Sequence, residues 1–325
     1  MQKVIETVLI GLSTGSIYAL MSLAIVLVWR STRVVNFAQA GQAMLSTYIG
    51  YEIATRSEVF WLGLVFAIAA GALIGAGVDY FFMRVLFKHA TSGPAAVVAP
   101  VIATLGLLGL IRSGVGLIWG GDLRSIEAPV SRDGYTIGET TLPFSPLNTL
   151  IISTVCIVLI AISILFTRTN LGLALRASAY APEIAQLAGI KTAQTRTIGW
   201  AIAGGVGGIA GMLITSYNFL SPNSLDLLLV FGFIAAVIGG LESMVGSVIG
   251  ALILGVGLTF ILNYVGTSLT FISGFLVLIV VLLVKPEGIF GSRKVRRQSA
   301  HQKNASHHCG PSFVFVLDQP QSDWP

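Results

Sequence analysis

The chain has 325 residues, of which 54% are hydrophobic and only 10% are charged. Soluble domains carry about 25% charged residues, so this composition excludes a soluble enzyme and indicates a polytopic membrane protein. The formal net charge of +5 does not indicate nucleic-acid binding, because the basic residues lie at the edges of apolar segments, as they do in cytoplasmic loops.

The first apolar run extends from Val4 to Trp29. It is longer than the apolar core of a signal peptide, which has about 7–15 residues, so we expect a first membrane span. With about 20 apolar residues for each crossing, the candidate segments are 4–29, 36–53, 60–83, 95–118, 147–167, 197–217, 225–240, 246–264 and 268–284. Some are short or interrupted by Gly, so we predict an all-α fold with eight or nine transmembrane or re-entrant helices.

Polar side chains inside the apolar segments are expensive and often mark a pathway. Isolated hydroxyls such as Ser13, Thr14, Ser16 and Tyr18 in the first segment have a simpler explanation, because Ser and Thr can bond back to their own helix. The side-chain amides of Asn36, Gln39 and Gln42 are harder to provide with hydrogen-bond partners. We predict a translocation path that includes Asn36, Gln39, Gln42, Thr104 and Glu242. Asp79, near the end of its segment, is expected at the membrane interface.

Small residues recur four apart in several apolar segments. The pairs are Gly11/Gly15, Gly71/Gly75, Gly204/Gly208, Gly207/Gly211 and Gly246/Gly250. Residues four apart share one helix face, so small residues there let two helices approach closely. We interpret these pairs as sites of ordinary packing within the chain.

The loop at 168–196 is polar and basic between two apolar segments. Pro182 suits the first turn of a helix and Glu183 favours the positive end of its dipole. Gly189 suits a left-handed stop, with Ile190 as the apolar residue after it. We therefore predict a short helix at about 182–188 that docks a soluble partner. The alternative is an amphipathic connector that rests on the lipid headgroups.

The loops also predict the orientation in the membrane. The 168–196 loop and the segment after the last span are basic, whereas 119–146 carries several acidic residues. The positive-inside rule places the first two in the cytoplasm and 119–146 outside. The side of the N-terminus depends on whether eight or nine helices cross.

Two common motifs of soluble catalysis do not occur in the sequence. It has no phosphate-binding loop and no H-E-x-x-H pair. We therefore expect no enzyme activity and no cofactor in this chain, so a separate polypeptide would supply the energy for uphill transport. His307, His308 and Cys309 match structural zinc spacing poorly, so no metal site is predicted. We divide the chain into a permease domain at 1–291 and a disordered cytoplasmic tail at 292–325.

Four collinear stretches resemble a known family. They are GLSTGSIYALMSLAIVLVW (11–29) with VVNFAQAGQAMLSTYIG (34–50), GLALRASAYAPEIAQLAGIK (172–191), GGLESMVGSVIGALILG (239–255) and KPEGIFG (285–291). Together they resemble the permease subunit of the branched-chain amino acid type of ABC (ATP-binding cassette) importer. That family also serves urea, amides and some aromatic acids.

This resemblance implies a set of partners and a site. The permease would pair with a paralogue or with itself in the cytoplasmic membrane of a bacterium, with its C-terminus in the cytoplasm. ATP would be used by separate ATPase subunits, and an extracytoplasmic binding protein would deliver the solute. The residues that would couple the permease to the ATPase are Arg176, Ala177, Pro182, Glu183, Ala185, Gly189 and Ile190.

The chain also departs from the family pattern. Ala40 and Gly41 stand where Gly and an acidic residue are common, Glu242 stands where Gly is common, and 299–325 matches nothing in the family. The alternative function is a stand-alone channel or secondary carrier for a small neutral solute such as urea. A membrane scaffold fits the clustered amides poorly. The transported solute is left open.

Overall fold

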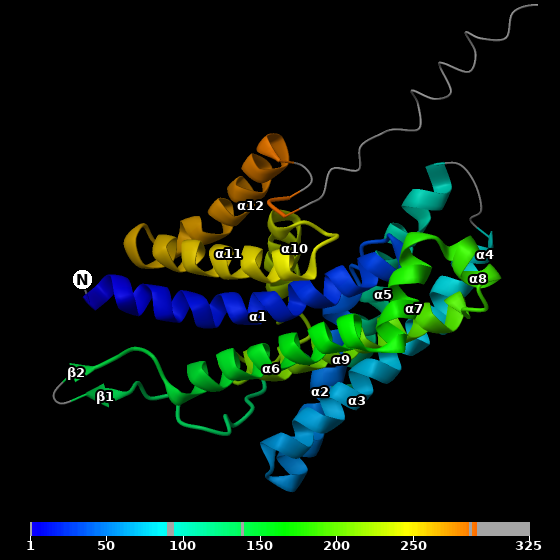
Figure 1. Ribbon diagram of the computed structural model, residues 1–325. Coiled ribbons are helices and arrows are strands. Elements are labelled where there is room, and N and C mark those ends of the chain that lie inside the picture. The colour runs from blue at the N-terminus through cyan, green and yellow to red at the C-terminus, as the bar shows by residue number, and fades with distance from the viewer. Residues whose placement is uncertain (1, 90–93, 138–139, 286–287, 291–325) are drawn as a thin grey trace, which may run out of the picture. The chain divides into compact units, whose positions relative to one another are not determined.

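The computed structural model describes residues 2–89, 94–137, 140–285 and 288–290, and most of these residues are helical (Figure 1). The helices in chain order are α1 (Gln2–Thr32), α2 (Gln39–Ser57), α3 (Phe60–Gly77), the π-helix η1 (Val78–Met83), α4 (Arg84–His89), α5 (Pro94–Trp119), α6 (Pro146–Arg168), α7 (Asn170–Tyr180), α8 (Pro182–Leu187), α9 (Thr192–Thr215), α10 (Asp226–Gly239), α11 (Met244–Tyr264) and α12 (Thr267–Val284). In the loop before α6, β1 (Thr136–Ile137) and β2 (Thr140–Thr141) pair antiparallel. The predicted disordered tail, 292–325, lies outside the described residues.

A helix covers each of the nine segments that apolar length predicts. Of the helices in the described ranges, six are long and apolar enough to cross a membrane: Lys3–Thr32, Phe60–Phe87, Val98–Trp119, Pro146–Arg168, Thr192–Thr215 and Met244–Tyr264. The helices α2, α10 and α12 do not meet that criterion. The prediction of a polytopic helical membrane protein is therefore confirmed, and the number of crossings stays a prediction.

The helices α1 and α9 lie at the centre of the packing. In each of them 67% of the most apolar stretch is buried, against 17% in α5 and 22% in α6. Trp200 and Met212 on α9 are completely enclosed. The outer helices leave large apolar side chains uncovered, such as Leu110 on α5 and Ile157 on α6. Lipid or a partner subunit would have to cover these outer faces.

The central helices approach each other at glycines. A Cβ atom added to Gly204 on α9 would overlap the carbonyl oxygen of Gly71 on α3, and one added to Gly71 would overlap that of Gly204. Gly11 and Gly15 on α1 meet the backbone of α11 in the same way. Small residues are how spanning helices pack without a hydrophobic force between them. The predicted role of these pairs in intramolecular packing is confirmed.

The segment from Phe60 to His89 is one continuous helical run interrupted by the π-helix η1. The amide of Arg84 donates to the carbonyl of Asp79, five residues earlier, where an α-helix would bond four residues back. Such π-turns are rare and frequently lie at functional sites. Here the turn carries the buried Asp79.

Candidate functional site

The loop between α6 and α9 folds into two helices with defined ends. Thr169 caps α7, because its Oγ1 accepts a hydrogen bond from the amide of Gly172 at 3.0 Å. Gly172 itself lies against the backbone of Phe166 on α6, where a Cβ atom would not fit. The turn from α6 into α7 is therefore closely packed.

The helix α8 ends at the predicted glycine. Gly189 has φ of +83°, a conformation that favours glycine over any residue with a Cβ atom. The amide of Ile190 donates to the carbonyl of Ala185 and the amide of Gly189 donates to that of Gln186, both at 2.9 Å. This pair of bonds is the Schellman motif. A short helix that starts at Pro182 and stops before Gly189 is thus confirmed, within one residue of the predicted end.

One face of α8 is buried and the other is exposed and apolar. Ala185 is 4% exposed, whereas Ile184 is 68% exposed and Leu187 is 90% exposed. Residues three apart lie on the same side of a helix, so Ile184 and Leu187 form one outward apolar patch. Exposed apolar patches with a polar rim mark interaction sites. The predicted coupling residues do not include these two, although their spacing is visible in the sequence.

The predicted coupling residues surround that patch rather than form it. Pro182, Glu183 and Gly189 are exposed, as is Arg176 on α7. Ala177 and Ile190 are half-buried, and Ala185 is the buried contact. The structure therefore places most of the predicted set on α8 and its ends, whereas Arg176 and Ala177 lie on α7.

A groove lies beside α8. It has a volume of about 390 Å³ between the end of α1, α7, α8 and the start of α9, and its lining includes Arg33, Gln186 and Arg196. The Gln186 amide donates to the hydroxyl of Thr192 at 2.8 Å and so joins α8 to α9. Movement of α8 would therefore act directly on the start of α9.

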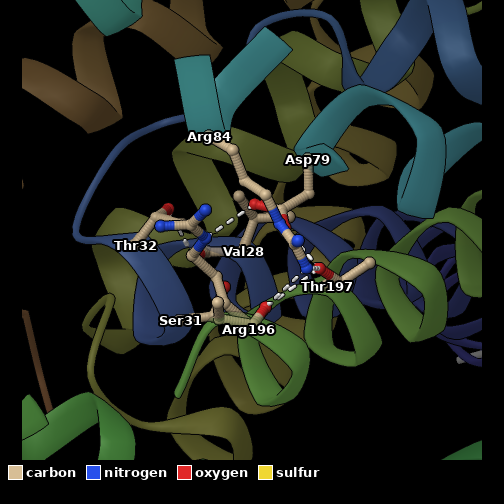
Figure 2. A network of polar contacts seen from close by, with 8 residues as sticks. Val28, Ser31, Thr32, Asp79, Arg84, Arg196 and Thr197 are labelled. Atoms are coloured by element: carbon tan, nitrogen blue, oxygen red, sulfur yellow. Dashed lines mark hydrogen bonds and ion pairs between the residues drawn. The ribbon is translucent and has the colours of Figure 1, made fainter. Parts of the chain in front are cut away.

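Asp79 forms the centre of a buried ionic network (Figure 2). Arg196 donates to its Oδ1 at 2.7 Å, and the Thr197 hydroxyl donates to its Oδ2 at 2.6 Å. The Arg84 guanidinium donates to Thr197 at 2.8 Å and its Nε lies 3.8 Å from Asp79 Oδ2. A buried carboxylate is tolerated only when it is paired and hydrogen-bonded. This network joins η1 and α4 to the start of α9, next to the end of α1 at Val28–Thr32.

Aromatic rings hold the two arginines of this network. The Arg196 guanidinium lies 5.1 Å from the centre of the Phe87 ring, and that of Arg84 lies 4.6 Å from the Tyr80 ring. A cation over an aromatic face is attracted to it. The network was not found from the sequence, because Asp79 and Arg196 are 117 residues apart.

Most of the predicted path residues gather at the start of α2. The Asn36 amide donates to Gln39 Oε1 at 3.2 Å, and Gln39 donates to the carbonyl of Ala203 on α9 at 3.1 Å. The backbone amide of Phe37 donates to the Thr104 hydroxyl on α5 at 3.4 Å. Asn36, Gln39 and Thr104 are completely buried. The structure brings α2, α5 and α9 together around these groups.

Gln42 differs from its neighbours. Its side chain is also completely buried, yet among the residues that the structure describes neither its amide nitrogen nor its oxygen has a hydrogen-bond partner. A buried amide without partners is unfavourable by about 1–3 kcal/mol. Such a group is a candidate for contact with water or a solute in another conformation.

Glu242 lies elsewhere. Its carboxylate forms an ion pair with Arg33, and both side chains are more than 40% exposed. It follows the break after α10, where Gly240 has φ of +97°. The enclosed amides of α2 are a different environment, so the structure does not bring Glu242 together with Asn36, Gln39 and Thr104.

A second polar cavity opens between α1, α6 and the end of α9, with a volume of about 340 Å³. The Ser13 hydroxyl donates to Asn148 Oδ1 at 2.8 Å, and the Tyr217 hydroxyl donates to the same oxygen. Ser13 was noted in the sequence, but Asn148 and Tyr217 were not. No group of three His, Cys, Asp or Glu side chains in the described ranges could hold a metal ion.

A protein-family model described as "Branched-chain amino acid transport system / permease component" matches residues 7–284. The chain belongs to this family. It is a family of transport permeases, not of enzymes.

Curated relatives of this permease include proteins named as branched-chain amino acid transport permeases. It is 29% identical over 292 residues to the "Probable branched-chain amino acid transport permease protein LivH" of Methanocaldococcus jannaschii, covering 85% of this chain and 89% of that protein. It is 26% identical over 297 residues to BraD of Pseudomonas aeruginosa and to LivH of Escherichia coli, each called a "High-affinity branched-chain amino acid transport system permease protein", with 88% of this chain and 95% of the relative covered. No solved structure is significantly similar to this chain. The matches confirm the resemblance drawn from the four stretches.

Proposed function

We propose that this permease forms one half of the translocation pore of an ATP-driven importer, and that α8 docks on a separate ATPase subunit. The proposed solute is a branched-chain amino acid or a similar small amide or acid, in keeping with the names of the relatives. The observation that carries the docking role is the outward pair Ile184 and Leu187 on a helix with a fixed end. A loop that only joined two spans would not need this exposed apolar pair.

The mechanism rests on the rigidity of α8. Its glycine stop fixes the start of the following segment, and Gln186 joins α8 to Thr192 at the start of α9. ATP-driven closure of the ATPase dimer would push on Ile184 and Leu187 and move α9 with α8. The Asp79 network would carry the same displacement to η1 and α4, because Arg196 and Thr197 belong to the first turns of α9.

The solute path would open along α2. Gln39 bonds to the carbonyl of Ala203 in the middle of α9, so displacement of α9 would separate these two groups. Asn36, Gln39, Gln42 and Thr104 are enclosed here, which corresponds to a closed path. Glu242 is not part of this enclosed set, because its carboxylate pairs with Arg33 away from the amides of α2. Amides and hydroxyls can replace the hydration shell of a small polar solute.

The rest of the assembly follows from the same proposal. A second permease subunit, either a paralogue or this chain itself, completes the pore, and an extracytoplasmic binding protein delivers the solute. ATP is bound by the ATPase subunits, and this chain needs no cofactor of its own. Eight or nine helices span or enter the membrane, with α7, α8 and the C-terminus in the cytoplasm and the 119–146 loop outside.

The test is a co-purification of the tagged permease with its ATPase. Leu187→Asp places a charge in the exposed patch of α8, whereas Leu123→Asp does the same at a residue that is 67% exposed in the 119–146 loop. We expect the native chain and Leu123→Asp to retain the ATPase and Leu187→Asp to lose it. Retention by all three would contradict docking through α8. If the folded native chain retains no ATPase, the stand-alone channel or carrier replaces the importer.

A further inference from the structure

An apolar trough opens on the outer face between α1, α6 and α11, away from both polar cavities described above. Its volume is about 600 Å³, and its walls include Leu23, Leu159, Ile162, Phe166, Val245 and Val248. On α6 the lining runs from Leu159 to Thr167, which is about 12 Å along a helix. One leaflet of a bilayer core is about 15 Å thick, half of about 30 Å. The trough is therefore nearly as long as one leaflet of the bilayer core.

The trough ends at a cluster of charges. Arg30, Arg176 and Glu242 line its end, and Glu242 forms an ion pair with Arg33. Among the residues that line the trough, Glu242 is the one carboxylate against the two arginines. The Arg30 guanidinium lies 5.6 Å from the centre of the Phe166 ring, at the wall of the trough. The end of the trough therefore has an excess of positive charge.

Two guanidinium groups at the end of an apolar surface favour an anion as a partner, because arginine binds phosphate oxygens strongly. Basic pockets between spanning helices on the cytoplasmic side bind anionic lipid headgroups. We propose that an anionic phospholipid occupies this trough, with its phosphate bound by Arg30 and Arg176 and one acyl chain along α1, α6 and α11. Arginine suits this role because its planar group binds phosphate oxygens in pairs.

Charge favours a lipid over a second copy of the chain. A second copy would need to bring a carboxylate to Arg30 and Arg176, yet the chain has a formal net charge of +5. A free phosphate ion would satisfy the arginines but leave the apolar walls exposed. A phospholipid satisfies both parts of the site. By joining the end of α1 to α7, it would also fix the base of the loop that carries α8.

The test measures lipid retained by the purified permease in detergent by native mass spectrometry. Phosphatidylglycerol, phosphatidylcholine and inorganic phosphate are supplied separately. Arg30→Gln removes one charge from the site, and Arg56→Gln removes an exposed charge on α2, outside the trough. Ile160→Trp fills the trough from its exposed rim, and Ile157→Trp adds the same bulk on α6 outside its lining. Thermal unfolding checks that each variant is folded.

We expect the native chain, Arg56→Gln and Ile157→Trp to retain phosphatidylglycerol in preference to phosphatidylcholine. Arg30→Gln and Ile160→Trp should each weaken this retention about tenfold or more, as the loss of a charge-assisted contact or of chain packing implies. If Arg30→Gln does not fold, the tryptophan pair still decides the proposal. Equal retention of both lipids, or unchanged retention in Ile160→Trp, would overturn it.

Two further results would assign the trough to another occupant. Displacement of phosphatidylglycerol by millimolar inorganic phosphate would show a simple anion site. A disulfide dimer formed through Ile160→Cys, in a chain with Cys156 and Cys309 replaced by Ser, would show that a second copy covers the trough. Either result would exclude the lipid site.

Discussion

Two buried polar regions of this permease contrast in how completely their groups are paired. At Asp79 both carboxylate oxygens meet donors from α9, and Arg84 and Arg196 also contact aromatic rings. At the start of α2, Gln39 is paired, but both polar atoms of the Gln42 side chain are buried without a partner. A carboxylate with both oxygens hydrogen-bonded is held rigidly, whereas an amide without partners is held less tightly in one state. The first region suits force transmission and the second suits a path that changes.

The largest effect on stability is expected from a substitution of Asp79. Asp79→Asn keeps the shape but leaves Arg84 and Arg196 facing a neutral group, and losing one partner of a buried ion pair lowers the free energy of unfolding by about 3–5 kcal/mol. Thermal unfolding in detergent measures this loss. Glu52→Gln is the control, because its ion pair with Arg56 is exposed and is worth about 0.5 kcal/mol. Equal losses in both variants would contradict the structural role of Asp79.

The helix α9 joins the two regions, and a substitution at its closest contact tests that connection. Gly204→Ala places a methyl group against the carbonyl of Gly71, and overpacking of this kind lowers the free energy of unfolding by about 1–3 kcal/mol. Gly257→Ala on α11 meets nothing within 4 Å, so it should be neutral or slightly stabilising. Denaturation curves of the two variants compare them. An unchanged free energy of unfolding in Gly204→Ala would show that α3 and α9 can move apart to accept the methyl group.

The helix stop that follows α8 should affect transport more than folding. Gly189→Val forces a branched residue into a left-handed conformation, which is unfavourable by about 1–2 kcal/mol. We expect α8 to lose its fixed end, so that ATP hydrolysis continues while leucine uptake into vesicles falls. Ala188→Val, at a residue with ordinary φ of −79°, is the control. Normal uptake by Gly189→Val would exclude coupling through a rigid α8.

The smallest effect on stability, and of the opposite sign, is expected at Gln42. Gln42→Leu removes a buried amide that has no partner, so unfolding should become harder by about 1 kcal/mol, or stay unchanged. Gln39→Leu removes the bond to Ala203 and should make unfolding easier by about the same amount. If Gln42 contacts the solute, its variant is stable but transports leucine poorly. Full uptake by the stable variant would remove Gln42 from the path.

The sequence predicted features that depend on neighbouring residues. Apolar length located the helices, and Pro182 with Gly189 located both ends of α8. The sequence could not identify the ion-pair partners of Asp79 and Glu242. These partners, Arg196 and Arg33, come from distant parts of the chain, and such ion pairs leave no local sequence pattern. For the same reason, the sequence showed that the amides of α2 are unfavourable in an apolar segment, but it could not identify their partners. Only the structure shows that Gln39 bonds to α9 and that the Gln42 side chain has no partner among the described residues.

The π-turn at η1 also determines the register of everything after it. Its hydrogen bond spans five residues instead of four, so it holds one residue more than an α-helical turn, and each residue turns a helix by about 100°. Removing one residue from η1 would restore a regular helix and rotate Arg84 and Phe87 away from Thr197 and Arg196. The chain can therefore tolerate a change of length in its loops far better than the loss of a single residue here. The ionic network depends on a count of residues as much as on their identity.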